Sequence, residues 1–271
     1  MSEAESIANS EQPATRQSIA KDLTALGLAP DMTVMVHSSL SRLGFVVGGA
    51  QAVVEALLHV LGPGGTLMMP THSGALSDPA SWRNPPVPES WWQPIRDEMP
   101  AFDQALTPTR EMGSIVDCFL HVPGVRRSNH PTVSAATFGP NAAALLEDHN
   151  LTDRLGESSP QGKLYGLDGH VLLLGVDHGN NTSLHLAEVR SGVMPTVEAG
   201  APIMVDGERQ WVDFSHVEDD DSDFAELGEA FALTGGEAKG SVGSGVARLV
   251  RSRDVVDFGV DWIRSNRTAP S

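Results

Sequence analysis

The stretch that decides the fold is residues 32–71, MTVMVHSSLSRLGFVVGGAQAVVEALLHVLGPGGTLMMPT. Residues 32–41 read as an apolar strand that runs into a polar turn, and residues 66–70 read as a second apolar strand. Between them, about 50–61 has helical periodicity and ends at a Gly-Pro-Gly-Gly turn. Strand, helix and strand form a βαβ unit, which predicts two parallel strands joined by a right-handed crossover.

The flanking segments extend this α/β pattern. Residues 16–28 carry apolar side chains at helical spacing, and VLLLGV at 171–176 reads as a buried strand. Further expected elements are helices at about 111–121, after Gly139-Pro140, at 223–232 and in the last segment, a strand at 133–138 and a strand-like piece, RLV, at 248–250. Since no repeat or linker is evident, we expect one domain over 16–271 after a disordered tail, 1–15.

Residues 74–110 interrupt the pattern with a long, proline-rich insertion. A long irregular segment in a compact domain is usually functional or disordered. Trp82, Trp91 and Trp92 argue that this one packs against the rest of the protein. The insertion is therefore predicted to be a lid on the substrate side.

The chain is strongly acidic, with 35 acidic and 18 basic residues and a formal net charge of -17. This charge opposes the phosphate neutralisation that nucleic-acid binding requires, and it favours a cationic small ligand. Simple solvation of the surface accounts for the same charge equally well. The sequence therefore argues against a nucleic-acid partner and leaves the ligand open.

The sequence gives no indication of export or of a membrane span. The polar N-terminus lacks the order of a signal peptide, and no apolar run approaches the roughly 20 residues that cross a bilayer. Cys118 is the only cysteine, which excludes an intrachain disulfide and a cysteine-based zinc site. We therefore expect a cytoplasmic protein without a membrane partner.

The segment NNTSLHLAEVR, residues 180–190, follows the predicted strand 171–176. On a helix, His185 and Glu188 are three residues apart and share a face. Loops and helix starts just past buried strands are where α/β proteins bind ligands. The pair is either part of a site or an ordinary buried histidine bonded to a carboxylate, and this segment alone allows both.

Three other segments combine polar groups. HSSLSRLGFVVGGA, residues 37–50, places small hydroxyls and glycines before a helix, which suits an anion or a capped tight turn. RRSNHP, residues 126–131, is either a positive patch for a phosphate, centred on Arg126 and Arg127, or a solvated basic turn. The acidic tract VEDDDSDF, residues 217–224, is either a solvated surface or the source of a carboxylate for the site.

The histidines His37, His72, His130 and His185 lie near predicted strand ends. The zinc spacing H-E-x-x-H is absent, so the sequence predicts no metal site. A general base is the better use, because imidazole titrates near neutral pH and a carboxylate partner fixes its tautomer.

Together these segments resemble the aminoglycoside 3-N-acetyltransferases of the antibiotic acetyltransferase superfamily, which differ from the GNAT fold. The shared motifs extend from about residue 16 to 265 and stand here as VHSSLSRLGFVVGGAQAVVEAL, GPGGTLMMPT, FDQALTPTREMG, RSNHPTVS, GESSP and LLLGVDHGNNTSLHLAE. The loop from Ser73 to Met99 matches no subtype, which leaves the antibiotic range open.

The resemblance implies an α/β (α+β) fold with a central mixed β-sheet flanked by helices. It implies acetyl transfer from acetyl-CoA to the 3-amino group of a 2-deoxystreptamine aminoglycoside, giving antibiotic resistance, in a ternary complex without an acyl-enzyme. The alternatives are the same transferase acting on another amine metabolite and a non-catalytic binding protein. A homodimer is left open.

The resemblance also implies roles for individual residues. His185 is the expected general base, and Glu218 the carboxylate that orients it, with Asp219 and Asp220 as alternatives one or two residues along. His37 is expected near the thioester. The expected coenzyme residues are Ser38, Ser39, Gly48, Gly49, Thr71, Arg127, Ser128 and His130, and the expected aminoglycoside residues are His72, Asp78, Asp103, Glu188, Asp219 and Asp220. Acetyl-CoA is expected to enter on the side of Arg126 and Arg127, opposite the acidic tract.

Overall fold

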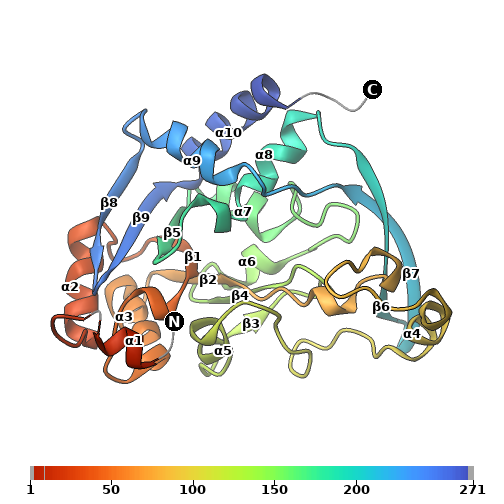
Figure 1. Ribbon diagram of the computed structural model, residues 1–271, viewed down its shortest axis with the longest axis horizontal. Coiled ribbons are helices and arrows are strands. Elements are labelled where there is room, and N and C mark those ends of the chain that lie inside the picture. Colours follow the sequence, from red (N-terminus) through yellow and green to blue (C-terminus); the bar gives the residue numbers. More distant parts are fainter. Residues whose placement is uncertain (1–2, 9, 268–271) are drawn as a thin grey trace.

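The computed structural model describes residues 3–8 and 10–267. Within this part of the chain, seven strands form one mixed sheet in the order β3-β4-β2-β1-β5-β9-β8 (Figure 1). Their bounds are β1 (Thr33–Ser38), β2 (Thr66–Pro70), β3 (Arg126–Arg127), β4 (Ala135–Phe138), β5 (His170–Leu174), β8 (Glu237–Val242) and β9 (Gly245–Arg251). The expected α/β (α+β) fold with a central mixed sheet is confirmed.

Strand β1 lies at the centre of the sheet and runs parallel to both β2 and β5. Helix α3 (Gly49–Leu61) joins β1 to β2, so the predicted βαβ unit is present. Strands β4 and β9 pair antiparallel outside this parallel core. Because β2 and β5 lie on opposite sides of β1, the carboxyl ends of the three strands form a topological switch point, where α/β folds bind ligands.

Helices cover both faces of the sheet (Figure 1). On one face α2 (Arg16–Leu26), α3 and α5 (Ser114–Leu120) pack over one buried cluster, and on the other α8 (Leu184–Ser191), α9 (Phe224–Ala232) and α10 (Ser252–Asn266) pack over a second. Val34 and Val36 belong to the first cluster and Met35 to the second. Alternation along β1 therefore turns His37 toward the face that carries α8.

A long hairpin, β6 (Thr196–Val205) and β7 (Glu208–Val217), was not expected from the sequence. Its turn is Asp206-Gly207, and both residues have positive φ (52° and 84°). Asp-Gly is a typical dipeptide of a two-residue hairpin turn that requires this conformation, so the sequence did contain an indication of the hairpin. Figure 1 shows the hairpin beside the main sheet, with α4 (Trp92–Glu98) at its far end.

The insertion 74–110 packs on this hairpin. Arg209 of β7 donates to the carbonyl of Met99 (2.9 Å), and the Phe102 N–H donates to the carbonyl of Pro202 in β6 (3.2 Å). The tryptophans pack only in part, since Trp91 is 57% exposed. The insertion contains α4 and short 3₁₀ turns, and most of its residues are exposed.

Other boundaries differ from the expectations. Residues 3–8, expected to be disordered, form helix α1 (Glu3–Ala8), and Ala14 pairs with Val46 in an isolated bridge. The two remaining helices are α6 (Ala142–Leu146) and α7 (Pro160–Gly166). No helix among the described residues is long and apolar enough to cross a membrane.

Candidate active site

A cavity of about 210 Å³ opens at the carboxyl ends of the three parallel strands. His37 at the end of β1, His72 after β2, and His185 in α8, which follows β5, all line it. The strand order thus brings together three histidines that are far apart in the sequence. Its polar lining also includes four residues of the loop before α8 and two acidic residues: Gly179, Asn180, Asn181, Thr182, Glu111 and Asp221.

His185 and Glu188 form a buried pair on one face of α8. The Nδ1 of His185 donates to Oε2 of Glu188 over 2.5 Å, and only 1% of the Glu188 side chain is exposed. This bond fixes the proton on Nδ1. Nε2 of His185 has no hydrogen-bond partner among the described residues, so its lone pair is available to a ligand in the cavity.

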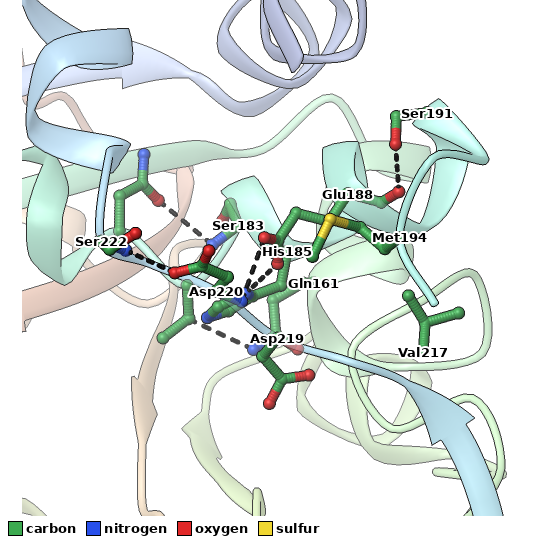
Figure 2. A network of polar contacts seen from close by, with 12 residues as sticks. Gln161, Ser183, His185, Glu188, Ser191, Met194, Val217, Asp219, Asp220 and Ser222 are labelled. Atoms are coloured by element: carbon green, nitrogen blue, oxygen red, sulfur yellow. Dashed lines mark hydrogen bonds and ion pairs between the residues drawn. The ribbon is translucent and has the colours of Figure 1, made fainter. Parts of the chain in front are cut away.

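Glu188 is held by partners on both carboxylate oxygens. Its Oε1 accepts from the backbone N–H of Asp220 (3.1 Å) and from the guanidinium of Arg267. Figure 2 shows Asp220 beside His185 and Glu188, with its carboxylate turned toward Ser222, whose N–H it accepts (3.1 Å). A carboxylate that is bonded in this way holds the imidazole in one orientation.

Glu218 does not orient His185, contrary to the expectation from the sequence. Glu218 is exposed, and its N–H donates to the carbonyl of Pro195 (2.9 Å). Asp219 pairs with Arg154, and Asp220 reaches the site through its backbone. The acidic tract therefore folds over the site and contributes a backbone N–H, because the carboxylate that the imidazole needs is already present three residues along α8.

His37 and His72 are neutral at physiological pH. Burial is the main cause that lowers the pKa of His37 from 6.5 to about 3. Burial, followed by the charge of Arg154, lowers the pKa of His72 from 6.5 to about 3. The cavity therefore presents neutral imidazoles beside the His185–Glu188 pair, and these do not repel a cationic ligand.

The family model for aminoglycoside 3-N-acetyltransferase matches residues 35–264, which include every strand-end histidine of this cavity. The chain belongs to the aminoglycoside 3-N-acetyltransferase family. Curated members of this family are named aminoglycoside N(3)-acetyltransferases, and the protein is accordingly an acyltransferase.

Two curated relatives and three solved structures illustrate the similarity. The SPbeta prophage-derived aminoglycoside N(3')-acetyltransferase-like protein YokD of Bacillus subtilis is 47% identical, over 94% of each chain. Aminoglycoside N(3)-acetyltransferase VII of Streptomyces paromomycinus is 36% identical, over 97% of this chain and 96% of its own. The crystal structure of YokD has a TM-score of 0.95 at 45% identity and covers 97% of this chain and 98% of its own.

Two further structures contain ligands. AAC-IIIb in binary complex with CoASH has a TM-score of 0.84 at 30% identity and covers 96% of this chain and all of its own. AAC-VIa bound to sisomicin has a TM-score of 0.84 at 27% identity, with the same coverage.

The predicted coenzyme residues of this family member fall into two groups. Ser38 lines the cavity of His185, and Ser39 lines a second cavity of about 720 Å³. Val176 and Asn180 border both cavities, so they are neighbours. Gly48 and Gly49 begin α3 with positive φ, and a Cβ at Gly49 would meet nothing within 4 Å.

The second group builds the protein framework instead. Arg127 donates to the carbonyls of Thr71 (2.8 Å) and Thr107 (2.5 Å), so its guanidinium is used internally. Ser128 Oγ accepts from the Ala135 N–H (3.0 Å), and His130 Nδ1 accepts from the Val133 N–H (3.1 Å). Thr71, Arg127, Ser128 and His130 line neither of the two adjacent cavities.

Of the predicted aminoglycoside residues, His72 lines the cavity of His185, whereas Asp78, Asp103, Glu188, Asp219 and Asp220 do not. Asp78 pairs with Arg96 (2.8 Å) inside the insertion. Asp103 accepts from the N–H groups of Ala105 and Leu106 (2.8 Å each), and these bonds lower the pKa of its carboxyl. Both aspartates organise turns, which is a common use of this residue type.

Sequence reasoning missed several residues of the site. Glu111 and Asp221 line the cavity, and Phe224 packs its ring 4.9 Å from that of His185. Arg267 follows α10 and had no local signal, because its partner Glu188 is 79 residues away. No cluster of three histidine, cysteine or carboxylate residues in the described ranges could hold a metal ion.

Proposed function

We propose that the protein is an acetyl-CoA-dependent N-acetyltransferase that modifies the 3-amino group of 2-deoxystreptamine aminoglycosides and thereby gives antibiotic resistance. The observation that carries this proposal is the buried His185–Glu188 pair, which faces a cavity at the topological switch point of a family member. The CoASH complex of AAC-IIIb and the sisomicin complex of AAC-VIa support the two substrate classes.

His185 is the general base in this proposal. An amine that attacks a thioester must be neutral, and Nε2 of His185 accepts its proton while Glu188 stabilises the resulting imidazolium. As the new N–C bond forms and the thioester C–S bond breaks, the proton passes from His185 to the departing thiolate. Of the N–H groups at 37–39 and 72–74, those of Ser39 and Ser73 donate to the carbonyls of Leu174 and Thr132 (2.9 Å each), so neither is free to stabilise the oxyanion.

We propose direct transfer in a ternary complex. Cys118 lies in α5 and does not line the cavity, and burial raises the pKa of its thiol, which disfavours the nucleophilic thiolate. Ser38 lines the cavity, yet no histidine in the described part of the chain bonds its hydroxyl. A serine without an adjacent base is a weak nucleophile.

The two neighbouring cavities suit the two substrates. Glu111 and Asp221 give the catalytic cavity negative charge, which attracts a polycationic aminoglycoside. Arg42, Arg248 and Asp177 line the second cavity together with several glycines, and Arg248 is bonded to Glu237 and to the carbonyl of Val176. The side chain of Arg42 has no ion-pair partner among the described residues, so it suits the phosphates of acetyl-CoA better than Arg127, which is used internally.

Mass spectrometry of an aminoglycoside panel incubated with the protein and acetyl-CoA tests the proposal. The expected product carries one additional acetyl group on the 3-amino nitrogen, with one free thiol released per acetyl transferred. Binding of both compounds without thiol release would reject a catalytic role. Acetylation of other amines, with no turnover of any aminoglycoside, would reject the proposed substrate class but support the proposed transferase reaction.

A further inference from the structure

A second buried histidine lies in the loop that carries the catalytic residue. His178 belongs to a 3₁₀ turn (His178–Asn180) between β5 and α8, and it does not line the catalytic cavity. Its Nε2 contacts Oε2 of Glu237 in β8 over 2.9 Å, and the side chains are 3% and 5% exposed. A Cβ at Gly228 of α9 would lie 2.3 Å from its Cβ, so α9 packs directly on this turn.

The proton on Nε2 of His178 follows from its partner. The other oxygen of Glu237 lies 3.5 Å from Nε of Arg248, and Arg248 donates to the carbonyl of Val176 (3.0 Å). A buried carboxylate beside a guanidinium is charged and can only accept hydrogen bonds. His178 therefore donates from Nε2 to Glu237.

The other nitrogen of His178 faces Asn181. The Oδ1 of Asn181 accepts from the N–H of Ser183 (3.2 Å), and Ser183 is the N-cap residue of α8. This bond turns the Nδ2 of Asn181 toward Nδ1 of His178, 3.3 Å away. Nδ1 must then be an acceptor, and every donor in this series of contacts meets an acceptor.

We propose that His178 is a positioning residue, which acts through Asn181 and Ser183 to fix the start of α8 and the orientation of His185. Glu237 of β8 fixes the proton on Nε2 of His178, and this leaves Nδ1 as the acceptor that holds Asn181. Asn181 and Thr182 of the same loop line the catalytic cavity, so a shift there changes the catalytic geometry. This inference rests on the proposed role of His185 as the base.

Two substitutions at His178 separate its two hydrogen bonds. His178→Asn places an amide oxygen near the position of Nδ1, which keeps the acceptor for Asn181 and removes the bond to Glu237. His178→Gln places an amide nitrogen near Nε2, which keeps the bond to Glu237 and removes the acceptor for Asn181. Each variant loses one buried hydrogen bond, and because His178→Asn loses the bond to the carboxylate, it should be the less stable of the two.

The expected result is a difference in kcat rather than in KM. His178→Gln should lower kcat by about 10- to 100-fold, the usual effect of misplacing a catalytic group by roughly 1 Å. His178→Asn should retain kcat within about threefold although it has the lower Tm, and both variants should keep the KM values of the two substrates within about twofold. Equal losses of kcat in the two variants, or losses that follow Tm, would reduce His178 to a packing residue.

A double-variant cycle tests whether the effect passes through His185. In a His185→Ala background, His178→Gln should cause no further loss of the residual rate, because the group that it positions is absent. The same fold loss in both backgrounds would overturn the inference and leave the proposed function intact. Full activity of His185→Ala alone would instead remove the proposed base and, with it, the ground for this inference.

Discussion

At the scale of single residues, the proposed chemistry depends on one imidazole and the carboxylate three residues along the same helix. His185→Ala should lower kcat by ~10² to 10⁴, the usual contribution of a general base. Glu188→Gln should lower kcat less, by about 10- to 100-fold, because the amide cannot stabilise the imidazolium although it fills the same space. Steady-state kinetics with both substrates measures these effects.

Glu218→Gln is the matched control for Glu188→Gln. The side chain of Glu218 is exposed and does not contact His185, so the same chemical change should leave kcat within about twofold of the wild-type value. A loss at Glu218 as large as that at Glu188 would mean that the acidic tract, rather than α8, supplies the orienting carboxylate during catalysis.

At the scale of elements, the periodicity of apolar residues predicted the strands and helices that bury one face in the core. Strands β1, β2 and β5 and helices α2, α3 and α10 were expected because their apolar residues recur at the spacing of a strand or a helix. The family motif predicted His185 as the base, whereas Glu188, one turn later, was placed among the aminoglycoside residues and the orienting role went to Glu218. The fold class was thus within reach of the sequence, and the base stays a prediction.

The remaining features depend on contacts between distant segments. Strand β8 reads EAKGSV, with two charged residues and a glycine, and is an edge strand that only pairing with β9 reveals. Arg127 was predicted to bind phosphate. The sequence around it does not reveal that its guanidinium donates to the carbonyls of Thr71 and Thr107. The partner of Glu188 at Arg267 is similarly a product of packing, which no local pattern encodes.

The packing of α9 on the loop before α8 gives a prediction at this scale. A methyl group at Gly228 would overlap the side chain of His178, so Gly228→Ala should lower the free energy of unfolding by about 1–3 kcal/mol. Gly166→Ala in α7 is the control, because a Cβ there meets nothing within 4 Å, and it should be neutral or stabilising by up to about 1 kcal/mol. Urea unfolding compares the two, and equal effects would contradict this close packing.

At the scale of the whole molecule, buried neutral histidines make stability dependent on pH. Burial is the main cause that lowers the pKa of His37 and His72 to about 3 and that of His149 to about 4, from 6.5. Below pH 6.5 the unfolded chain takes up protons that the folded protein does not, so stability falls with decreasing pH down to about pH 3–4.

The expected slope is up to about 1.4 kcal/mol per pH unit for each such histidine. Urea unfolding at three pH values between neutrality and the lower end of this window measures it. His37→Asn removes one of the titrating groups and should reduce the slope. Stability that is constant from neutral pH to the middle of the window would show that these histidines are protonated in the folded protein.

The net charge of -17 gives a second prediction for the molecule as a whole. Salt screens exposed charges beyond about 8 Å at physiological ionic strength, so the KM for a polycationic aminoglycoside should rise steeply with added salt. Glu111→Gln and Asp221→Asn, which remove charges that line the cavity, should weaken this salt dependence. Steady-state kinetics at low and high salt measures this dependence. A KM that does not change with salt would mean that the acidic surface lies away from the path of the substrate.

The contact between Arg267 and Glu188 affects the order in which the site is assembled during synthesis. Arg267 leaves the ribosome 79 residues after Glu188, which is on the order of 4 to 16 s at about 5–20 residues per second. Until then the carboxylate that holds the imidazole lacks its cation, and burying it is unfavourable. We therefore expect the pocket of His185 to be less stable in a nascent chain until Arg267, which follows α10, has emerged, and cleavage after α10 should return a finished molecule to that state.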